Sequence, residues 1–263
     1  MNMSVYLYAL IPMLIAGLLT WIISVIKKDV SIVDSLWPVF FIILALYAYS
    51  ITDIESIKSK LVVVLVAIWA LRLSLYITMR HWGHEEDHRY QAIRKNSDPG
   101  FKYKSLYMIF SFQAIVAWIV SLPLFYAINT SVRELTTIDY IGLTLWCTGM
   151  LFESVADYQL WKFKQLESNK GKVLTEGLWA YSRHPNYFGE FLVWWGFFCF
   201  ALSTANFIAI VSPLLMTYLL LKFSGVSLLE KTMILKPGYE TYMKNTNAFL
   251  PGFKNRSSSH EST

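Results

Sequence analysis

Charge is scarce in this chain. Only 16% of its 263 residues are Asp, Glu, Lys or Arg, whereas 55% are hydrophobic. A soluble domain carries about 25% charged residues. The deficit argues against a chain that is surrounded by water throughout, and it indicates lipid as the solvent for much of it. The net charge of +5 is modest and the basic residues are clustered, which suits a membrane surface better than nucleic acid.

Cysteine and histidine are also scarce, with two and five residues. Cys147 and Cys199 both lie inside apolar runs, where small buried thiols are more common than disulfides or metal ligands. His81, His84 and His88 lie close together beside acidic residues. A membrane di-iron enzyme needs more histidine clusters than this one, so the sequence predicts no metal site.

Three signatures are missing altogether. The sequence contains no internal repeat, no change of composition that would mark a second domain, and no glycine-rich phosphate-binding fingerprint. We therefore expect one integral membrane domain over residues 1–256. The polar residues 257–263 are predicted to form a disordered tail.

Long apolar runs are abundant. Seven runs are about long enough to cross a hydrocarbon core of roughly 30 Å. They are Val5–Ile26, Ser31–Ser50, Lys60–Met79, Leu106–Ile128, Ile138–Val155, Tyr187–Ala201 and Phe207–Phe223. Inside lipid they must be helical, because every backbone polar group needs an internal partner. No basic residue precedes the first run, so we expect an uncleaved first span rather than a signal peptide. The sequence predicts an all-α, polytopic transmembrane helix bundle of about seven spans.

Lysine and arginine are concentrated in alternate loops. The rich loops contain Lys27 and Lys28, then six basic residues between Arg80 and Lys104, five between Lys162 and Arg183, and those of the tail from Lys222 to Arg256. The other loops hold only Lys58, Lys60 and Arg133. The positive-inside rule then places the N-terminus outside and the C-terminus in the cytosol.

The segment Gly177–Glu190 predicts a binding site at the cytosolic surface. Pro185 suits the first position of a helix, and it pushes His184 into an extended conformation. Arg183 and His184 would then lie at a helix start, where free N–H groups attract anions such as pyrophosphates. Asn186, Tyr187 and Glu190 follow on the first turn. The structural alternative is an interfacial anchor, with Arg183 on a lipid phosphate and Tyr187 in an aromatic belt.

Two further segments carry polar residues near the same surface. In Phe152–Lys164, Glu153 and Asp157 share a helix face and could hold ribose hydroxyls, while Lys162 and Lys164 could hold a phosphate. The alternative is a helix end whose long side chains snorkel to the surface. In His81–Arg94, Glu86 and Tyr90 are one helical turn apart, which suggests an acid–phenol pair; the alternative is a solvated charged loop.

Two ionisable residues lie inside predicted spans. Asp34 is one turn into the second span, and Arg72 is well inside the third. Charges at such depth are expensive and indicate function by default. A buried Asp34–Arg72 ion pair with a structural role is the alternative.

These residues carry a resemblance to a known family. The sequence resembles the steroid 5-alpha-reductase-like superfamily, closest to its uncharacterised bacterial-type branch, over about Val30 to Phe253. The matching stretches are Val33–Trp37, Gly83–Arg94, Asp157–Lys172, Gly177–Glu190, Ser224–Glu230 and Pro237–Tyr242. The resemblance implies a seven-helix membrane fold and reduction, by NADPH, of a carbon–carbon double bond. It also implies cofactor contacts at Asp157, Lys164, Asn186, Tyr187, Glu190 and Glu230.

The sequence departs from that family in its substrate-binding residues. The steroid enzymes polarise the substrate ketone with a Gln-Glu pair in the second span and a tyrosine in the third. No such pair occurs here; Asp34 lies nearest to its place, and Arg72 or Tyr76 nearest to that of the tyrosine. A His-Pro followed by an aromatic residue and a glycine also occurs in isoprenylcysteine and phospholipid methyltransferases, which bind S-adenosylmethionine.

The leading hypothesis is an NADPH-dependent reductase acting on a lipophilic enone that enters from the bilayer. Asp34, Glu86 and Tyr90 are the candidates for stabilising the enolate. Arg183 and His184 join the implied cofactor contacts. The alternatives are a membrane methyltransferase using S-adenosylmethionine and a non-enzymatic scaffold that binds neither cofactor. The protein would reside in a bacterial plasma membrane or in the endoplasmic reticulum of a eukaryote.

Overall fold

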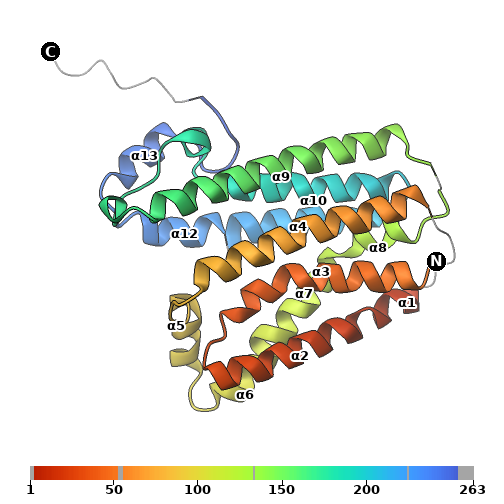
Figure 1. The fold of residues 1–263 in the computed structure, drawn as a ribbon, viewed down its shortest axis with the longest axis horizontal. Coiled ribbons are helices and arrows are strands. Elements are labelled where there is room, and N and C mark those ends of the chain that lie inside the picture. Colours follow the sequence, from red (N-terminus) through yellow and green to blue (C-terminus); the bar gives the residue numbers. More distant parts are fainter. Residues whose placement is uncertain (1–2, 53–55, 133, 224, 254–263) are drawn as a thin grey trace. The chain divides into compact units, whose positions relative to one another are not determined.

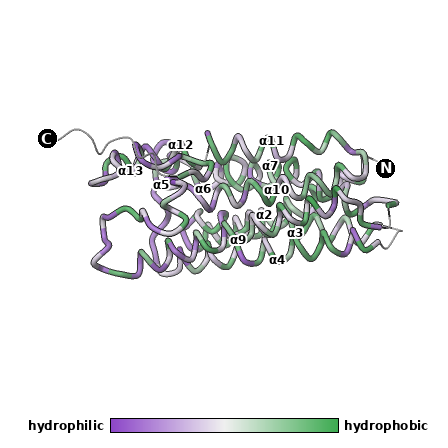
Figure 2. Tube along the Cα trace, turned by 90° about the horizontal axis from the view of Figure 1, so that it is seen from above, coloured by the Kyte–Doolittle hydropathy of each residue, from purple (hydrophilic) through white to green (hydrophobic). Residues whose placement is uncertain are grey.

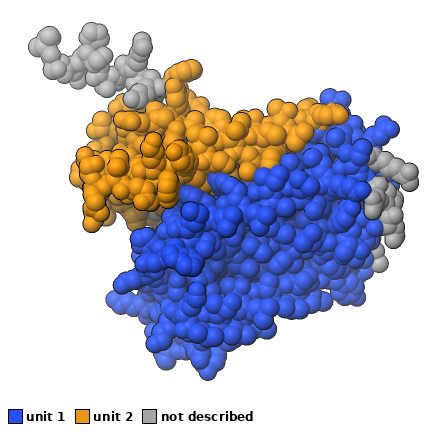
Figure 3. Space-filling view, in the orientation of Figure 1, with its two compact units in different colours: residues 1–139, 200–212 blue, residues 140–199, 213–263 orange. Residues whose placement is uncertain are grey.

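The computed structural model describes residues 3–52, 56–132, 134–223 and 225–253. Over these ranges the regular secondary structure is helical and contains no strand, which confirms the predicted all-α class. The chain divides into two compact units, Met1–Asp139 with Phe200–Ser212, and Tyr140–Cys199 with Pro213–Thr263 (Figure 3). The predicted tail at 257–263 lies outside the described residues.

The first unit contains most of the long apolar helices (Figure 1). In chain order they are α1 (Met3–Tyr8), α2 (Leu10–Lys27), α3 (Ile32–Ser50), α4 (Ile57–His81), α5 (His88–Ser97), α6 (Phe101–Ser105), α7 (Phe112–Val120) and α8 (Leu122–Ile128). Helix α3 is central, since it packs against α2, α4, α7 and α8. In Figure 2 helices α3 and α4 are mostly hydrophobic, whereas α5 is hydrophilic.

Four helical stretches are long and apolar enough to cross a membrane, judged by length and composition. They are Ser4–Lys27, Ile32–Ser50, Ile57–His81 and Phe101–Val120. The first three coincide with the first three predicted runs, and the fourth overlaps the predicted run Leu106–Ile128 only from Leu106 to Val120. The chain is therefore an integral membrane protein with a helical architecture.

The fourth predicted run, Leu106–Ile128, is not one regular helix. A π-helical turn, Leu106–Ser111, joins α6 to α7. The helix is then interrupted at Ser121, whose N–H is shared between the carbonyls of Ala117 and Trp118. Pro123 explains the interruption, because it has no N–H to donate and sits in the first turn of α8.

The boundaries between the two units fall inside helices. It contains α9 (Thr137–Lys164) from Tyr140 onward, α10 (Pro185–Leu202) up to Cys199, α11 (Val211–Tyr218) from Pro213, α12 (Val226–Met233) and α13 (Tyr239–Asn245). Short 3₁₀ turns occupy Glu167–Asn169 and Gly177–Ala180. Helix α9 continues past Val155 to Lys164, and α10 begins at Pro185, both as the sequence predicted.

Glycines bring α9 and α10 into very close contact. A Cβ added at Gly189 would lie 2.5 Å from the backbone nitrogen of Glu153 and 2.6 Å from the carbonyl oxygen of Gly149. A Cβ at Gly196 would lie 2.7 Å from the carbonyl oxygen of Gly142. Small residues are what allows two membrane helices to approach backbone to backbone. This contact fixes the helix that carries the Gly177–Glu190 segment.

A buried ion pair joins the starts of α4 and α9 within the first unit. The side chains of Lys58 and Asp139 have no exposed surface, and Nζ lies 2.9 Å from Oδ2. The hydroxyl of Ser203 accepts from Lys58 Nζ and donates to Asp139 Oδ1, both at 2.7 Å. Thr136 donates its N–H and its hydroxyl to Asp139 Oδ2. Both charges are thus compensated inside the protein.

Candidate functional site

Asp34 is the centre of a polar cluster in the first unit. Its Oδ2 accepts from Nη2 of Arg89 at 2.7 Å, and its Oδ1 accepts from the hydroxyl of Tyr90 at 2.5 Å. Both partners lie on α5, whose N-cap is Asp87: the Asp87 carboxylate accepts from the N–H and the Nε of Arg89. The short helix α5 therefore presents a cation and a phenol to an acid inside a membrane helix.

The hydroxyl of Tyr90 has a defined direction. It accepts a hydrogen bond from Nε2 of Gln113 at 3.2 Å and donates its proton to Asp34. Burial and the neighbouring Asp34 carboxylate raise the pKa of Tyr90 well above its ordinary value. The phenol consequently stays protonated at neutral pH and can act as a hydrogen-bond donor.

Glu86 does not share this role. Its carboxylate accepts from Nη2 and Nε of Arg94 at 2.7 and 3.0 Å, and from the N–H of Val30 at 2.9 Å. The structure therefore brings Tyr90 together with Asp34, whereas Glu86 binds the segment that precedes α3. The sequence suggested Glu86 as the acid beside Tyr90; in the structure the carboxylate that accepts from Tyr90 is that of Asp34.

Arg72 lies over an aromatic ring of its own helix. Its guanidinium carbon is 5.7 Å from the ring centroid of Tyr76, and Arg80 lies at the same distance from that ring. The two contacts to the Asp34 carboxylate come from α5; the sequence analysis named Tyr90 of this helix as a candidate beside Asp34, but not Arg89. Arg89 and Gln113 are thus site residues that sequence reasoning missed.

The start of α10 forms a second polar cluster, in the second unit. Arg183 is 8% exposed, and its Nε and Nη2 reach Glu230 Oε1 at 2.8 and 2.7 Å. Its Nη1 donates to the carbonyls of Met243 and Thr246 at 3.0 and 2.6 Å. The guanidinium is therefore engaged in holding α12 and α13 to the α10 start. The sequence had placed Arg183 against a cofactor anion.

Two buried polar atoms at the same helix start have no hydrogen-bond partner. They are Nε2 of His184 and Oδ1 of Asn186. Nε2 lies 3.4 Å from Glu230 Oε1 without making a hydrogen bond of good geometry. Burial lowers the pKa of His184 to about 4, although Glu230 opposes the shift, so the ring is neutral at pH 7. Because buried polar atoms are normally paired, this pair of atoms indicates a place for a ligand.

The other predicted cofactor residues lie on the same two helices. Asp157, on α9, is 4% exposed and accepts from Nδ2 of Asn186 at 3.2 Å. The ring of Tyr187 is stacked on that of His184, with centroids 5.6 Å apart. Glu190 is half-buried on α10, and Lys164 is the exposed last residue of α9. Asp157, His184, Asn186 and Tyr187 are thus brought together, and Glu230 joins them through α12.

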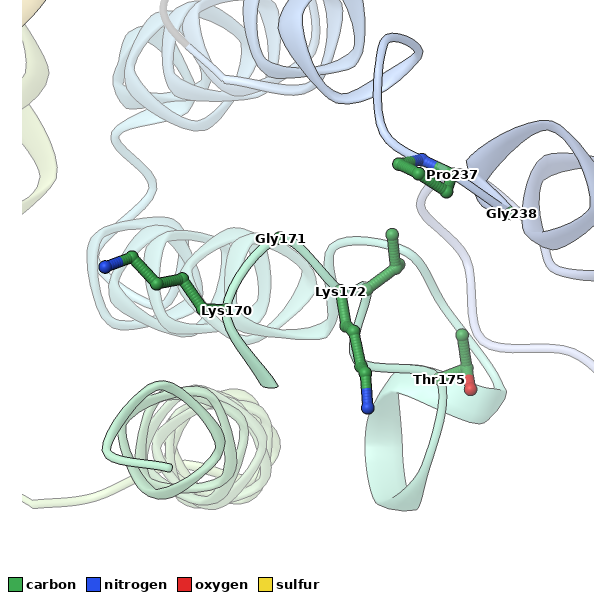
Figure 4. Close-up of a pocket in the computed structure, with 7 residues that line it drawn as sticks. Lys170, Gly171, Lys172, Thr175, Pro237 and Gly238 are labelled. Atoms are coloured by element: carbon green, nitrogen blue, oxygen red, sulfur yellow. The ribbon is translucent and has the colours of Figure 1, made fainter. Parts of the chain in front are cut away.

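A hollow of about 450 Å³ opens elsewhere in this unit (Figure 4). The loop from Lys170 to Thr175 forms one side, and Pro237 with Gly238 forms the other. In Figure 4 the side chains of Lys170 and Lys172 extend in different directions and do not converge on the gap. This hollow has the size of a ligand site but not the converging polar groups that orient a ligand. Within the described ranges, no group of three His, Cys, Asp or Glu side chains could hold a metal ion.

Comparison with known proteins identifies relatives without an assigned activity. A family described as "Protein of unknown function (DUF1295)" matches residues 20–246. The chain is similar to an uncharacterized protein of Schizosaccharomyces pombe, with 27% identity over 289 residues that cover 95% of this chain and 80% of the yeast protein. No solved structure matches. Function must therefore be argued from the two clusters.

Proposed function

The chain belongs to the DUF1295 family, and we propose that it is a membrane reductase that uses NADPH to reduce a carbon–carbon double bond conjugated to a carbonyl in a lipophilic substrate. The observation that carries this proposal is a pair of buried atoms at the start of α10, His184 Nε2 and Asn186 Oδ1, that make no hydrogen bond of good geometry; Nε2 lies 3.4 Å from Glu230 Oε1. Its second support is the resemblance of the sequence to the steroid 5-alpha-reductase-like superfamily.

The residues at the α10 start fit a nicotinamide dinucleotide. A neutral histidine and an amide can exchange hydrogen bonds with a carboxamide or a ribose, and the carboxylates of Asp157 and Glu230 accept from ribose hydroxyls. The α10 start adds the positive end of its helix dipole, which favours a pyrophosphate. Arg183 would serve by keeping Glu230 and α13 in place. When bound, NADPH supplies the hydride.

Tyr90 would supply the hydrogen bond that stabilises the enolate. In the structure the single phenol proton of Tyr90 is donated to Asp34, so it would turn from the carboxylate to the carbonyl oxygen when the substrate binds. Gln113 fixes the oxygen of Tyr90, and Arg89 fixes the carboxylate. Donors positioned in advance where negative charge develops are a large source of catalysis in a site that excludes water. Glu86 would have a structural role only.

We also place seven spans in the membrane, with the N-terminus outside and the C-terminus in the cytosol. The four long apolar stretches account for four spans. Helices α9 and α10, with 28 and 18 residues, and the apolar helical segment Phe207–Phe223 supply three more. The α10 start would then face the cytosolic side, where NADPH is found.

Cofactor binding tests this function most directly. NADPH should raise the melting temperature of the protein purified in detergent, because a ligand at about 100 times its Kd stabilises by about 2.7 kcal/mol. Asn186→Leu should weaken that effect by roughly tenfold in Kd, the loss of about one hydrogen bond. The matched control is Asn206→Leu, since the side-chain amide of Asn206 donates to nearby Thr204, away from the α10 start. If S-adenosylmethionine raised the melting temperature and NADPH did not, the protein would be a methyltransferase rather than a reductase. If neither ligand changed the melting temperature, a non-enzymatic scaffold would be favoured.

A turnover assay separates the two clusters. With a membrane-soluble cyclic enone as substrate, Tyr90→Phe should bind NADPH like the unmodified protein and consume it at least 10²-fold more slowly. Normal consumption in Tyr90→Phe would remove the phenol from the reaction while leaving the cofactor site unaffected.

A further inference from the structure

A second hollow, of about 330 Å³, lies in the first unit between the end of α2 and the start of α6. Its lining consists of Ser24, Val25, Lys28, Val30, Arg94, Phe101, Lys102 and Ser105. None of Asp34, Arg89, Tyr90 and Gln113 contributes to it, so it is distinct from the polar cluster assigned to the reaction. It also lies outside the unit that contains the α10 start.

Three cations border this hollow. Arg94 is paired with Glu86 at 2.7 Å, and its guanidinium lies 4.5 Å from the ring centroid of Phe101. Lys28 and Lys102 are exposed, and among the described residues neither has a carboxylate within ion-pair distance. The ring of Tyr103 is 5.5 Å from the ammonium of Lys102. Lys28 and Lys102 are therefore not held in ion pairs, although Asp29 and Asp98 lie within electrostatic range of Arg94.

The rest of the wall is formed by buried, partly apolar residues that are held in place by hydrogen bonds. Phe101 and Val30 are each 2% exposed and belong to a buried cluster with Val33, Tyr90, Ile109 and Phe110. Nε1 of Trp21 donates to the carbonyl of Lys102 at 3.0 Å and to the hydroxyl of Ser105 at 3.2 Å. These bonds hold the start of α6 against α2, so the backbone positions of Lys28 and Lys102 are held on either side of the hollow.

The hollow also lies at the level of a membrane surface. The first apolar stretch ends at Lys27, and the fourth begins at Phe101. Just beyond the hollow, both stretches expose apolar side chains: Ile23 and Ile26 are 47% and 75% exposed on α2, and Tyr107 and Met108 are 61% and 41% exposed on the π-helical turn that packs against it. Such surfaces suit acyl chains, while the cations suit a headgroup.

We propose that this hollow binds the phosphate monoester headgroup of an anionic phospholipid. A phosphate monoester carries up to two negative charges, which match the ammonium groups of Lys28 and Lys102. The hydroxyls of Ser24 and Ser105 on the wall donate to the carbonyls of Trp21 and Lys102, so the two lysines carry the contact with the phosphate. The acyl chains lie along the exposed apolar surface of α2. A soluble phosphate ester has the same headgroup chemistry but gains nothing from that surface.

Native mass spectrometry of the protein in detergent tests this site. The probes are dioleoyl phosphatidic acid, dioleoyl phosphatidylcholine and glycerol 3-phosphate. Phosphatidic acid should bind at least tenfold more tightly than the other two. The double variant Lys28→Gln with Lys102→Gln should lose about tenfold or more in affinity for it, and the corresponding double arginine variant should retain most of it.

The matched control removes the same charge next to the hollow. Lys27 and Lys95 are exposed and do not line it, so Lys27→Gln with Lys95→Gln should bind phosphatidic acid within about threefold of the unmodified protein. An equal loss in both double variants would mean general attraction to a basic surface and would overturn the site. So would equal binding of phosphatidylcholine. If glycerol 3-phosphate bound as tightly as phosphatidic acid, the hollow would be a site for soluble phosphate esters and the lipid proposal would be wrong. All variants should melt within a few degrees of the unmodified protein.

Discussion

At the scale of single residues, the protonation of His184 links the stability of the protein to pH. Its pKa is lowered to about 4 by burial in the folded protein, against the 6.5 of an exposed ring, while Glu230 raises it and Arg183 lowers it. Between pH 4 and pH 6.5, His184 binds a proton in the unfolded chain but not in the folded chain. The contribution of His184 to the free energy of unfolding is therefore fully present above pH 6.5. It is lost as the pH falls towards 4, and it amounts to about 3 kcal/mol.

This linkage predicts a pH-dependent difference between two proteins. His184→Gln cannot take up the proton, so its melting temperature in detergent should fall less than that of the unmodified protein between pH 7 and pH 4.5. Each carboxylate that titrates in this range is present in both proteins and cancels in the comparison. A parallel decline in the two proteins would show that His184 is protonated in the folded state or is not buried there.

Which residues would carry polar chemistry was partly visible in the sequence. Pro185 marks a helix start, and His184 and Asn186 beside it were predicted as site residues for that reason. Arg89 and Gln113 were not predicted. A surface arginine and a glutamine in an apolar run have many ordinary explanations, and only the packing of α5 and α7 brings both to the Asp34–Tyr90 pair. Sequence spacing contains no information on that contact.

At the scale of helices, the glycine contact between α9 and α10 sets a strict size limit. Gly189→Ala places a methyl group about 2.5 Å from backbone atoms of α9, so one helix must move. Overpacking of this kind destabilises by about 1–3 kcal/mol. Since the α10 start would move as well, we expect a lower melting temperature together with weaker NADPH binding.

Gly17→Ala on α2 provides the comparison. A Cβ there meets no atom closer than 3.6 Å, which is ordinary contact, and alanine favours a helix over glycine by about 1 kcal/mol. The melting temperature of Gly17→Ala should therefore stay the same or rise. If Gly189→Ala were tolerated equally well, the two helices would not be in backbone contact.

Helices were easier to predict than their irregularities. Apolar length and the positions of proline located α3, α4, α9 and α10 to within a few residues. The interruption at Ser121 was missed, although Pro123 was in the sequence, because the run around it is apolar enough to read as one span. The π-helical turns leave no comparable signal, since they depend on how neighbouring side chains pack.

At the scale of the whole molecule, the orientation in the membrane decides where both clusters can work. In a background with Cys147→Ser and Cys199→Ser, Glu134→Cys should be labelled by an impermeant maleimide added outside intact cells, and Asn96→Cys should not. Both positions are exposed to solvent. Labelling should reverse in inverted vesicles. The opposite pattern would place the α10 start on the side that lacks NADPH.

The buried triad of Lys58, Asp139 and Ser203 has a consequence for biosynthesis. Ribosomes deliver the chain from its N-terminus, so Lys58 reaches the membrane before either of its partners has been made. An unpaired ammonium group is expensive in hydrocarbon. The ion pair that compensates this ammonium group can therefore form only after Asp139 has been made. The first unit can reach its final packing only after Ser203 has left the ribosome. The contacts of this triad are therefore among the last to form in the first unit.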